Sequence, residues 1–238
     1  MSGGVHLVGG GWGGDRRVWT AFTAEAAARS GRAWPRVVVV AVRDGDEQEH
    51  AAKLLAAVET AAAVDPVVLA LREGDRLDPG AIPADVDGVL VGGGLTPAYA
   101  DAVAPAAARI RALVADGVPY AGFSAGSAIA PARALVAGWR RLGRPVLDEE
   151  VAEERDELAV VDGIGLVPFA VDVHAAQWGT TSRLLVAVEA GLVPHGVAVD
   201  EDTAVVVAGG ATRVVGTGNA WWASPAAGGV LVRREPGD

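Results

Sequence analysis

The stretch VPYAGFSAGSA, residues 118–128, is the segment of the chain that decides its fold. An apolar strand is expected to run into Gly122-x-Ser124-x-Gly126, and the small residues that follow favour a helix. This order is typical of a nucleophile elbow, where a Cβ at either glycine would collide with the neighbouring strand or helix. Such a turn raises the Ser124 hydroxyl above the carboxyl edge of a parallel sheet and leaves the N–H of Ala125 free to bind an oxyanion. The pattern therefore predicts an α/β fold with a nucleophilic serine.

The N-terminal half alternates apolar strands with helical segments. The run RVVVVAV at 36–42 is continuously apolar, as in a parallel strand that is covered on both faces. The alternation predicts a mostly parallel central sheet with helices on both faces and ligands at the carboxyl ends of the strands. Strands are expected at 5–8, 36–42, 66–71, 88–91 and 118–123, and helices at 15–30, 47–63 and 96–115, the last with Thr96 as N-cap.

The C-terminal half has a different pattern. The acidic segment 148–157 is expected to be a solvated helix or loop. Several short apolar runs separated by glycines predict a short antiparallel extension near the C-terminus. The expected elements are an extended stretch at 171–173, a helix at 181–190 and strands at 197–199, 204–208, 213–215 and 230–232. With 238 residues, 51% of them hydrophobic, the chain is expected to form one α/β domain over residues 1–238.

Composition excludes several classes of protein. The formal net charge of −10 argues against nucleic acid or an anionic membrane as a partner. The absence of cysteine excludes disulfides, thiolate metal sites and a cysteine nucleophile. Neither a signal peptide nor a membrane-spanning run is evident, so we expect a cytoplasmic protein that needs no metal or organic cofactor.

A second glycine-rich segment has the spacing of a dinucleotide fingerprint. Gly9, Gly11 and Gly14 form G-x-G-x-x-G after the first strand, and Asp44 follows the second strand. However, Asp15 would lie where the pyrophosphate binds, and like charges repel. We therefore favour a plain strand-to-helix turn over nucleotide binding.

A nucleophilic serine needs a base, and the chain has four histidines. His6 lies inside the first strand, and His50 lies on a charged helix where we expect it to be solvated. His174 ends the extended stretch and so should lie at the same sheet edge as Ser124. His195 precedes its strand and should lie at the opposite edge. This placement favours His174 as the base.

The base in turn needs a carboxylate to orient it. Glu201 follows the strand at 197–199 and is the preferred partner of His174. A competing arrangement is Ser124, Asp172 and His195, in the chain order of α/β-hydrolases.

Three glycines at 92–94 end the strand next to the serine strand. The amide of Gly94 is the expected second donor to an oxyanion, opposite the amide of Ala125. The alternative is a turn that simply requires glycine.

Four motifs together resemble one family. They are VGGG at 91–94, GFSAGSA at 122–128, VDVHAAQWGTTSRL at 171–184 and GVAVDEDTAVVV at 196–207. The combination resembles the cyanophycinase and peptidase E (aspartyl dipeptidase) family of serine peptidases. The resemblance implies a class I glutamine amidotransferase-like fold with serine in place of cysteine, and a homodimer. It also implies a Ser124, His174 and Glu201 triad, with Gly94 and Ala125 as oxyanion donors.

The chain departs from that family where substrate carboxylates are expected to bind. Val173 replaces the usual glutamine, and Trp178 and Thr180 replace arginines. Losing guanidinium groups removes bidentate carboxylate recognition, so we expect a substrate less acidic than cyanophycin and a more apolar pocket. The residues expected to face the substrate are Leu95, Thr96, Asp172, Val173, Trp178 and Arg183.

These observations predict a serine peptidase or amidase that cleaves a peptide or isopeptide bond through an acyl-enzyme. Two alternatives remain. One is an esterase that uses the same serine, and the other is a non-catalytic member of the fold that binds a ligand or a partner.

Overall fold

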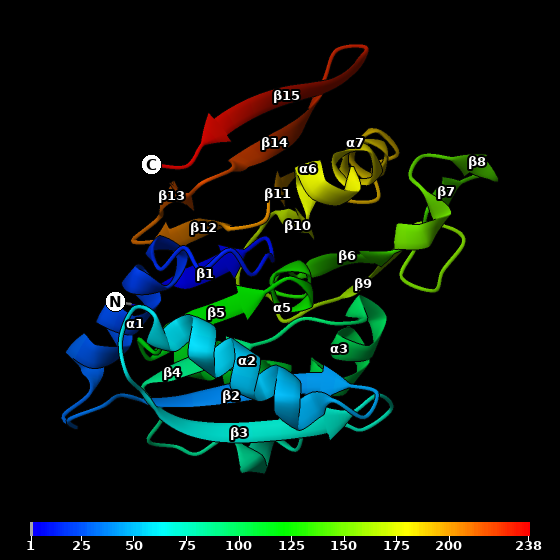
Figure 1. Ribbon diagram of the computed structural model, residues 1–238. Coiled ribbons are helices and arrows are strands. Elements are labelled where there is room, and N and C mark those ends of the chain that lie inside the picture. Colours follow the sequence, from blue (N-terminus) through cyan, green and yellow to red (C-terminus); the bar gives the residue numbers. More distant parts are fainter. Residues whose placement is uncertain (1) are drawn as a thin grey trace.

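The computed structural model describes residues 2–238 and contains a seven-stranded, mostly parallel central sheet (Figure 1). Five strands are mutually parallel, and the last two join one side of the sheet in antiparallel orientation. The strand order is β13 (Ala211–Gly216), β12 (Thr203–Ala208), β1 (Val5–Val8), β5 (Tyr120–Phe123), β4 (Gly88–Val91), β2 (Arg36–Arg43) and β3 (Asp65–Arg72).

Alternate residues of the central strands enter two different cores, because successive side chains of a strand point to opposite faces. Val37 and Val39 pack with α1 (Arg17–Arg29) and α2 (Glu47–Glu59). Val38 and Val40 pack with α3 (Thr96–Val103) and α4 (Ala107–Ala115) on the other face. This two-sided burial is the reason for the uninterrupted valine run, and it confirms the predicted α/β fold with helices on both faces.

A second sheet lies beside the first, in the order β10 (Ala170–Val173), β11 (Gly196–Val199), β14 (Asn219–Ala226) and β15 (Gly229–Pro236). β10 and β11 are parallel, and β14 and β15 complete the sheet as an antiparallel hairpin. α7 (Thr181–Glu189) packs against this sheet (Figure 1). The hairpin confirms the expected antiparallel extension, and β14 is an addition that the apolar pattern did not predict.

Shorter elements complete the described chain. They are η1 (Pro79–Ala81), η2 (Ala104–Ala106), α5 (Ala125–Ala128), β6 (Arg133–Ala137), β7 (Arg140–Arg141), β8 (Arg144–Pro145), η3 (Glu149–Val151), β9 (Ala159–Asp162) and α6 (Ala175–Trp178). None of the helices within residues 2–238 has the length and apolar character needed to cross a membrane.

The helix expected at 96–115 differs in two ways from the prediction. Pro105 interrupts it, because proline has no N–H to donate, and the 3-10 turn η2 separates α3 from α4. Leu95, not Thr96, is the N-cap residue. The amide and the hydroxyl of Thr96 instead donate to the carboxylate of Glu153, at 2.8 and 3.1 Å. The cap therefore comes from a distant segment, which local sequence rules cannot reveal.

The two sheets meet at the glycine loop after β1. The amide of His174, just after β10, donates to the carbonyl of Gly9 at 3.0 Å. The amide of Asp202, in the turn after β11, donates to the carbonyl of Gly10 at 2.8 Å. These bonds bring the carboxyl ends of β10 and β11 to the carboxyl end of β5, where Ser124 lies.

Candidate active site

Ser124 occupies a strained turn between β5 and α5. Its backbone has φ 51° and ψ −111°, a conformation that non-glycine residues rarely adopt. A Cβ on Gly122 would lie 2.5 Å from the carbonyl carbon of Gly126, and a Cβ on Gly126 would lie 2.1 Å from the carbonyl oxygen of Val91. Both glycines are thus required by close backbone approach, as the elbow pattern predicts.

The neighbouring hydroxyl, that of Ser127, is turned away from the site. It is buried and donates its hydrogen between the carbonyls of Val8 and Gly122, at 2.8 and 2.7 Å. Of the two serines in this turn, Ser124 is therefore the one whose hydroxyl is available at the carboxyl edge of the sheet.

The structure brings Ser124, His174 and Glu201 into one hydrogen-bonded chain. Ser124 Oγ lies 2.7 Å from His174 Nε2, and His174 Nδ1 lies 2.7 Å from Glu201 Oε1. β10 and β11 run parallel, so the residues that follow them reach the same edge of the sheet. A carboxylate at Nδ1 holds the proton there and leaves Nε2 able to accept the serine proton.

Burial sets the protonation state of His174. The residue is 6% exposed, and loss of hydration lowers the pKa of its imidazole, while the hydrogen bond to Glu201 opposes that shift. The net direction is downward, so the imidazole is neutral at neutral pH. A neutral imidazole is the form that can act as a base.

The glycine loop after β1 makes room for the histidine ring. Gly10 has φ +102°, and a Cβ there would lie 2.2 Å from His174 Cε1. A Cβ on Gly11 would lie 2.7 Å from Glu201 Cβ. The glycines that resemble a dinucleotide fingerprint therefore serve the close approach of these two side chains.

Replacing Gly10 with alanine is expected to displace the imidazole and lower turnover by about 100-fold, the scale of a misplacement of about 1 Å. The left-handed backbone also costs about 1–3 kcal/mol of stability for a residue with a Cβ. Rate constants measured beside a thermal melt separate these two effects. Gly14→Ala is the matched control, because Gly14 also has positive φ but no atom lies within 4 Å of its added Cβ. Equal activity losses in both variants would contradict the expectation.

Backbone amides are available beside the serine. Among residues 2–238, the amides of Gly93, Gly94 and Ala125 have no hydrogen-bond acceptor within the protein. Gly93 is the nearer glycine, since a Cβ there would lie 2.8 Å from Ser124 Cβ. Gly93 and Gly94 both line the cavity at Ser124. The group has the donors that an oxyanion requires.

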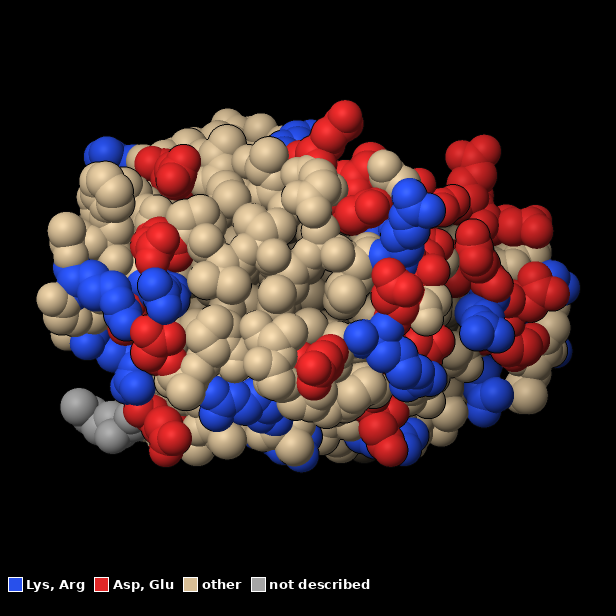
Figure 2. Space-filling model, turned by 90° about the horizontal axis from the view of Figure 1, so that it is seen from below, with Lys and Arg blue, Asp and Glu red and all other residues tan. Residues whose placement is uncertain are grey.

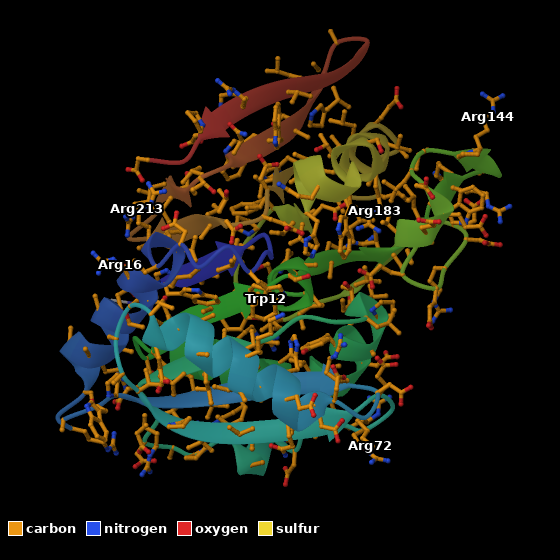
Figure 3. All side chains as sticks on the ribbon, viewed as in Figure 1. Trp12, Arg16, Arg72, Arg144, Arg183 and Arg213 are labelled. Atoms are coloured by element: carbon orange, nitrogen blue, oxygen red, sulfur yellow. The ribbon has the colours of Figure 1, made fainter. Side chains whose placement is uncertain are left out.

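A cavity of about 560 Å³ opens at Ser124 and His174. His50 lines it instead of being solvated as expected, and burial lowers the pKa of His50 to about 4. Trp12 lies between α2 and the end of β5, against Phe123 (Figure 3). The remaining lining residues are Arg43, Asp44, Asp46, Glu73, Gly93, Gly94, Leu95, Glu150, Val151, Glu153, Glu154 and Trp178.

The residues expected to face a substrate are divided between cavity and interior. Leu95 and Trp178 line the cavity. Asp172, on β10, is fully buried and binds Arg183 in a bidentate pair, at 2.7 and 2.9 Å. Arg183 extends from α7 (labelled in Figure 3). Val173 and Thr96 are also buried and do not line the cavity. Four of the six residues thus belong to the supporting structure around the site.

The structure does not assemble the competing arrangement with His195. The carboxylate of Asp172 is occupied by Arg183, and His195 precedes β11, at the edge opposite to His174. His195 contacts the ring of Phe169 at 6.3 Å between centroids. Ser124, Asp172 and His195 therefore do not form a hydrogen-bonded chain.

Most of the charged residues that line the cavity were not expected there from the sequence, and Glu153 is the clearest example. Glu153 lies in the acidic segment expected to be solvated, yet burial raises the pKa of its carboxyl group. Its backbone has φ 56°, and its side chain accepts from Thr96. No local signal distinguishes Glu153 from its acidic neighbours, because its burial depends on the position of α3.

Comparisons with known proteins identify the family of the chain. Residues 40–215 match peptidase family S51. No curated protein sequence matches the chain significantly. The fold is similar to the crystal structure of a peptidase from an acI-B1 Actinobacterium, with a TM-score of 0.69, 17% identity, and coverage of 100% of this chain and 95% of that one.

A second similar structure is that of a protein from Listeria monocytogenes EGD-e that is proposed to be a peptidase E. Its TM-score is 0.55 at 14% identity, and the match covers 91% of this chain and 99% of that one. At these identities the two structures support the fold, and the match of residues 40–215 carries the assignment. The chain therefore belongs to peptidase family S51 and is a serine-type peptidase.

Proposed function

We propose that Ser124, His174 and Glu201 form the catalytic triad of this peptidase. The observation that carries the proposal is the unbroken chain of two 2.7 Å contacts from Ser124 Oγ through the imidazole to Glu201. Ser124 Oγ attacks the carbonyl carbon of a peptide or isopeptide bond, and its proton passes to His174 Nε2. Glu201 holds the Nδ1 proton and stabilises the imidazolium that forms.

The remaining steps use the same groups in reverse. His174 gives its proton to the leaving amine as the C–N bond breaks, and an acyl-enzyme on Ser124 remains. Water then loses a proton to His174 and attacks the ester, and Ser124 recovers its proton as the acid product leaves. The developing oxyanion is stabilised by the amide of Ala125 and by an amide of the 92–94 turn, for which Gly94 was expected and Gly93 is nearer to Ser124.

We further propose that the substrate is a short peptide or isopeptide without an acidic group at the cavity. Six carboxylates line the cavity, those of Asp44, Asp46, Glu73, Glu150, Glu153 and Glu154. Arg43 also lines it, but its guanidinium is engaged by Asp46 at 2.9 Å. Arg183 is buried behind the site and neutralised by Asp172. An acidic substrate would therefore meet repulsion without a free cation to offset it.

The crowding of carboxylates affects their ionisation. Burial, followed by the charges of Asp44 and Glu154, raises the pKa of Glu73. Figure 2 shows Asp and Glu gathered toward the right-hand end, the side to which the arrowheads of β2 and β3 point in Figure 1. The negative field at the carboxyl ends of the strands supports a substrate that is neutral or basic.

A fluorophosphonate probe tests the proposed triad directly. We expect one covalent adduct on the folded protein, mapped by peptide mass to Ser124. The labelling rate should rise with pH and reach its plateau through a midpoint below about 6.5, because burial lowers the pKa of His174 and only its neutral form accepts a proton. His195→Ala is the matched histidine control and should label like the wild type. An adduct elsewhere, or a rate that depends on His195, would contradict the triad.

The same experiment distinguishes the proposed reaction from two alternatives. An esterase would label and would cleave activated esters but not amides. A non-catalytic binding member would show no adduct on a folded protein. We also propose that residues 1–238 form one domain, because β12 near the C-terminus pairs with β1. We also propose that the protein is a homodimer and that it is cytoplasmic.

A further inference from the structure

The indole of Trp178 is stacked on the imidazole of His174. The ring centroids are 3.8 Å apart, and the planes differ by 14°. Residues four apart lie on one side of a helical turn. The amide of Trp178 donates to the carbonyl of His174 at 2.8 Å, and Gly179, with φ +72°, ends α6 immediately afterwards. This single turn folds the indole back over the ring.

The stack supplies a restraint that the hydrogen bonds of His174 lack. Ser124 and Glu201 position the two ring nitrogens, and Gly10 lies close to Cε1. Hydrogen bonds at the two nitrogens alone would let the imidazole tilt about the line that joins those nitrogens. Trp178 covers a face and excludes water from it, while 42% of the tryptophan itself remains exposed at the cavity.

The same contact favours the charged form that the reaction creates. When His174 takes the serine proton, positive charge spreads over the ring. The π face of tryptophan attracts a cation, with a larger effect where water is excluded. Because the indole is already in place, no reorganisation is needed at the moment of proton transfer.

We propose that Trp178 is a positioning residue that acts through His174, holding the imidazole in line with Ser124 and stabilising the imidazolium. This role differs from that of a wall contacting the substrate, which the sequence suggested for Trp178. The inference rests on the proposed function, because it requires His174 to be the base.

Trp12 provides a contrast within the same cavity. It is also 42% exposed and lines the cavity, but it packs against Phe123 at 4.5 Å between centroids and lies under the ammonium of Lys53. A tryptophan that serves only as a wall should affect binding of a probe and not its chemistry. The two residues therefore separate the two roles.

The test uses the fluorophosphonate reaction, in which the Oγ–P bond forms, the P–F bond breaks, fluoride leaves and the Ser124 proton passes to His174. At about pH 8 His174 is neutral, so its titration does not affect the comparison. Trp178→Leu is expected to lower the maximal labelling rate constant, kinact, by about five- to thirtyfold, equivalent to about 1–2 kcal/mol, with little change in KI. Trp178→Phe, which keeps an aromatic face, should recover kinact to within about threefold of the wild type.

Trp12→Leu is the cavity contrast and should change KI more than kinact. Trp34→Leu, at a 61% exposed tryptophan that does not line the cavity, is the control for tryptophan loss itself. Thermal melts verify that each variant is folded, and Trp178→Phe serves as the second variant if leucine destabilises the protein. This inference alone would be overturned if the wild type is labelled and Trp178→Leu has an unchanged kinact, whether or not its KI changes. No Ser124 adduct on wild type would overturn the proposed function as well.

Discussion

Ser124→Ala and His174→Ala are each expected to abolish fluorophosphonate labelling and to lower peptide turnover by a factor of roughly 10⁴ or more. Alanine at 124 removes the atom that attacks, and alanine at 174 removes the acceptor of its proton. The two losses should be similar in size, and the double variant should lose little more, because groups that act as a unit have strongly non-additive effects. Mass spectrometry and turnover of a peptide library pool measure both quantities.

Ser127→Ala is the matched serine control for this pair. It lies one turn further into α5, and its hydroxyl is bound to two carbonyls and does not face the site. It should keep the adduct, with some loss of stability from the hydrogen bonds that its hydroxyl no longer makes. Residual peptide turnover in Ser124→Ala at more than about one per cent of the wild-type value would point to a different nucleophile.

Glu201→Gln is expected to lower turnover by about 10³-fold, somewhat less than the ~10⁴-fold typical of a buried triad carboxylate. Glu201 is 28% exposed at its side chain, so water screens part of its charge. The amide keeps the volume of the side chain but loses the negative charge that stabilises imidazolium, and it can favour the wrong imidazole tautomer. Turnover of the same peptide pool, measured as a function of pH, tests the expectation.

The adjacent carboxylate offers a close control for that change. Asp202 accepts from the amide of Gly13 at 2.8 Å, whereas the ring nitrogens of His174 bind Ser124 and Glu201. Asp202→Asn keeps an acceptor there and should leave turnover within about threefold of the wild-type value. Equal losses in the Glu201 and Asp202 variants would show a general effect of negative charge and not a triad role for Glu201.

Much of the architecture was predictable from local patterns. The valine run at 36–42 predicted a strand buried on both faces, and the glycines around Ser124 predicted a tight turn at the end of a strand. Both signals are local, because burial on two faces and close backbone approach each restrict the residue type at the position itself. The expectation that His174 lies at the same edge as Ser124 followed from the rule that parallel strands end at one edge. The parallel pairing of β10 with β11, which brings Glu201 to that edge, was not predicted, because the strand at 197–199 was grouped with the antiparallel extension.

Other features depended on contacts between distant segments. Asp172 and Arg183 were expected to face a substrate, yet they bind each other in the interior, where an unpaired charge is strongly disfavoured. Glu153 resembles its acidic neighbours in sequence, and only the amide and hydroxyl of Thr96 place its carboxylate at the cavity.

The sequence by itself determined the α/β sheet, the strained serine turn and the edge at which a base and a carboxylate would be found, since each follows from periodicity or from the steric demands of glycine. Tertiary structure alone decided which charged groups face the cavity, that Gly10 makes room for the imidazole, and that Trp178 stacks on His174. The physical reason is that the burial and the partners of a side chain depend on where distant segments pack. Neither hydropathy nor spacing along the chain encodes the position of those segments.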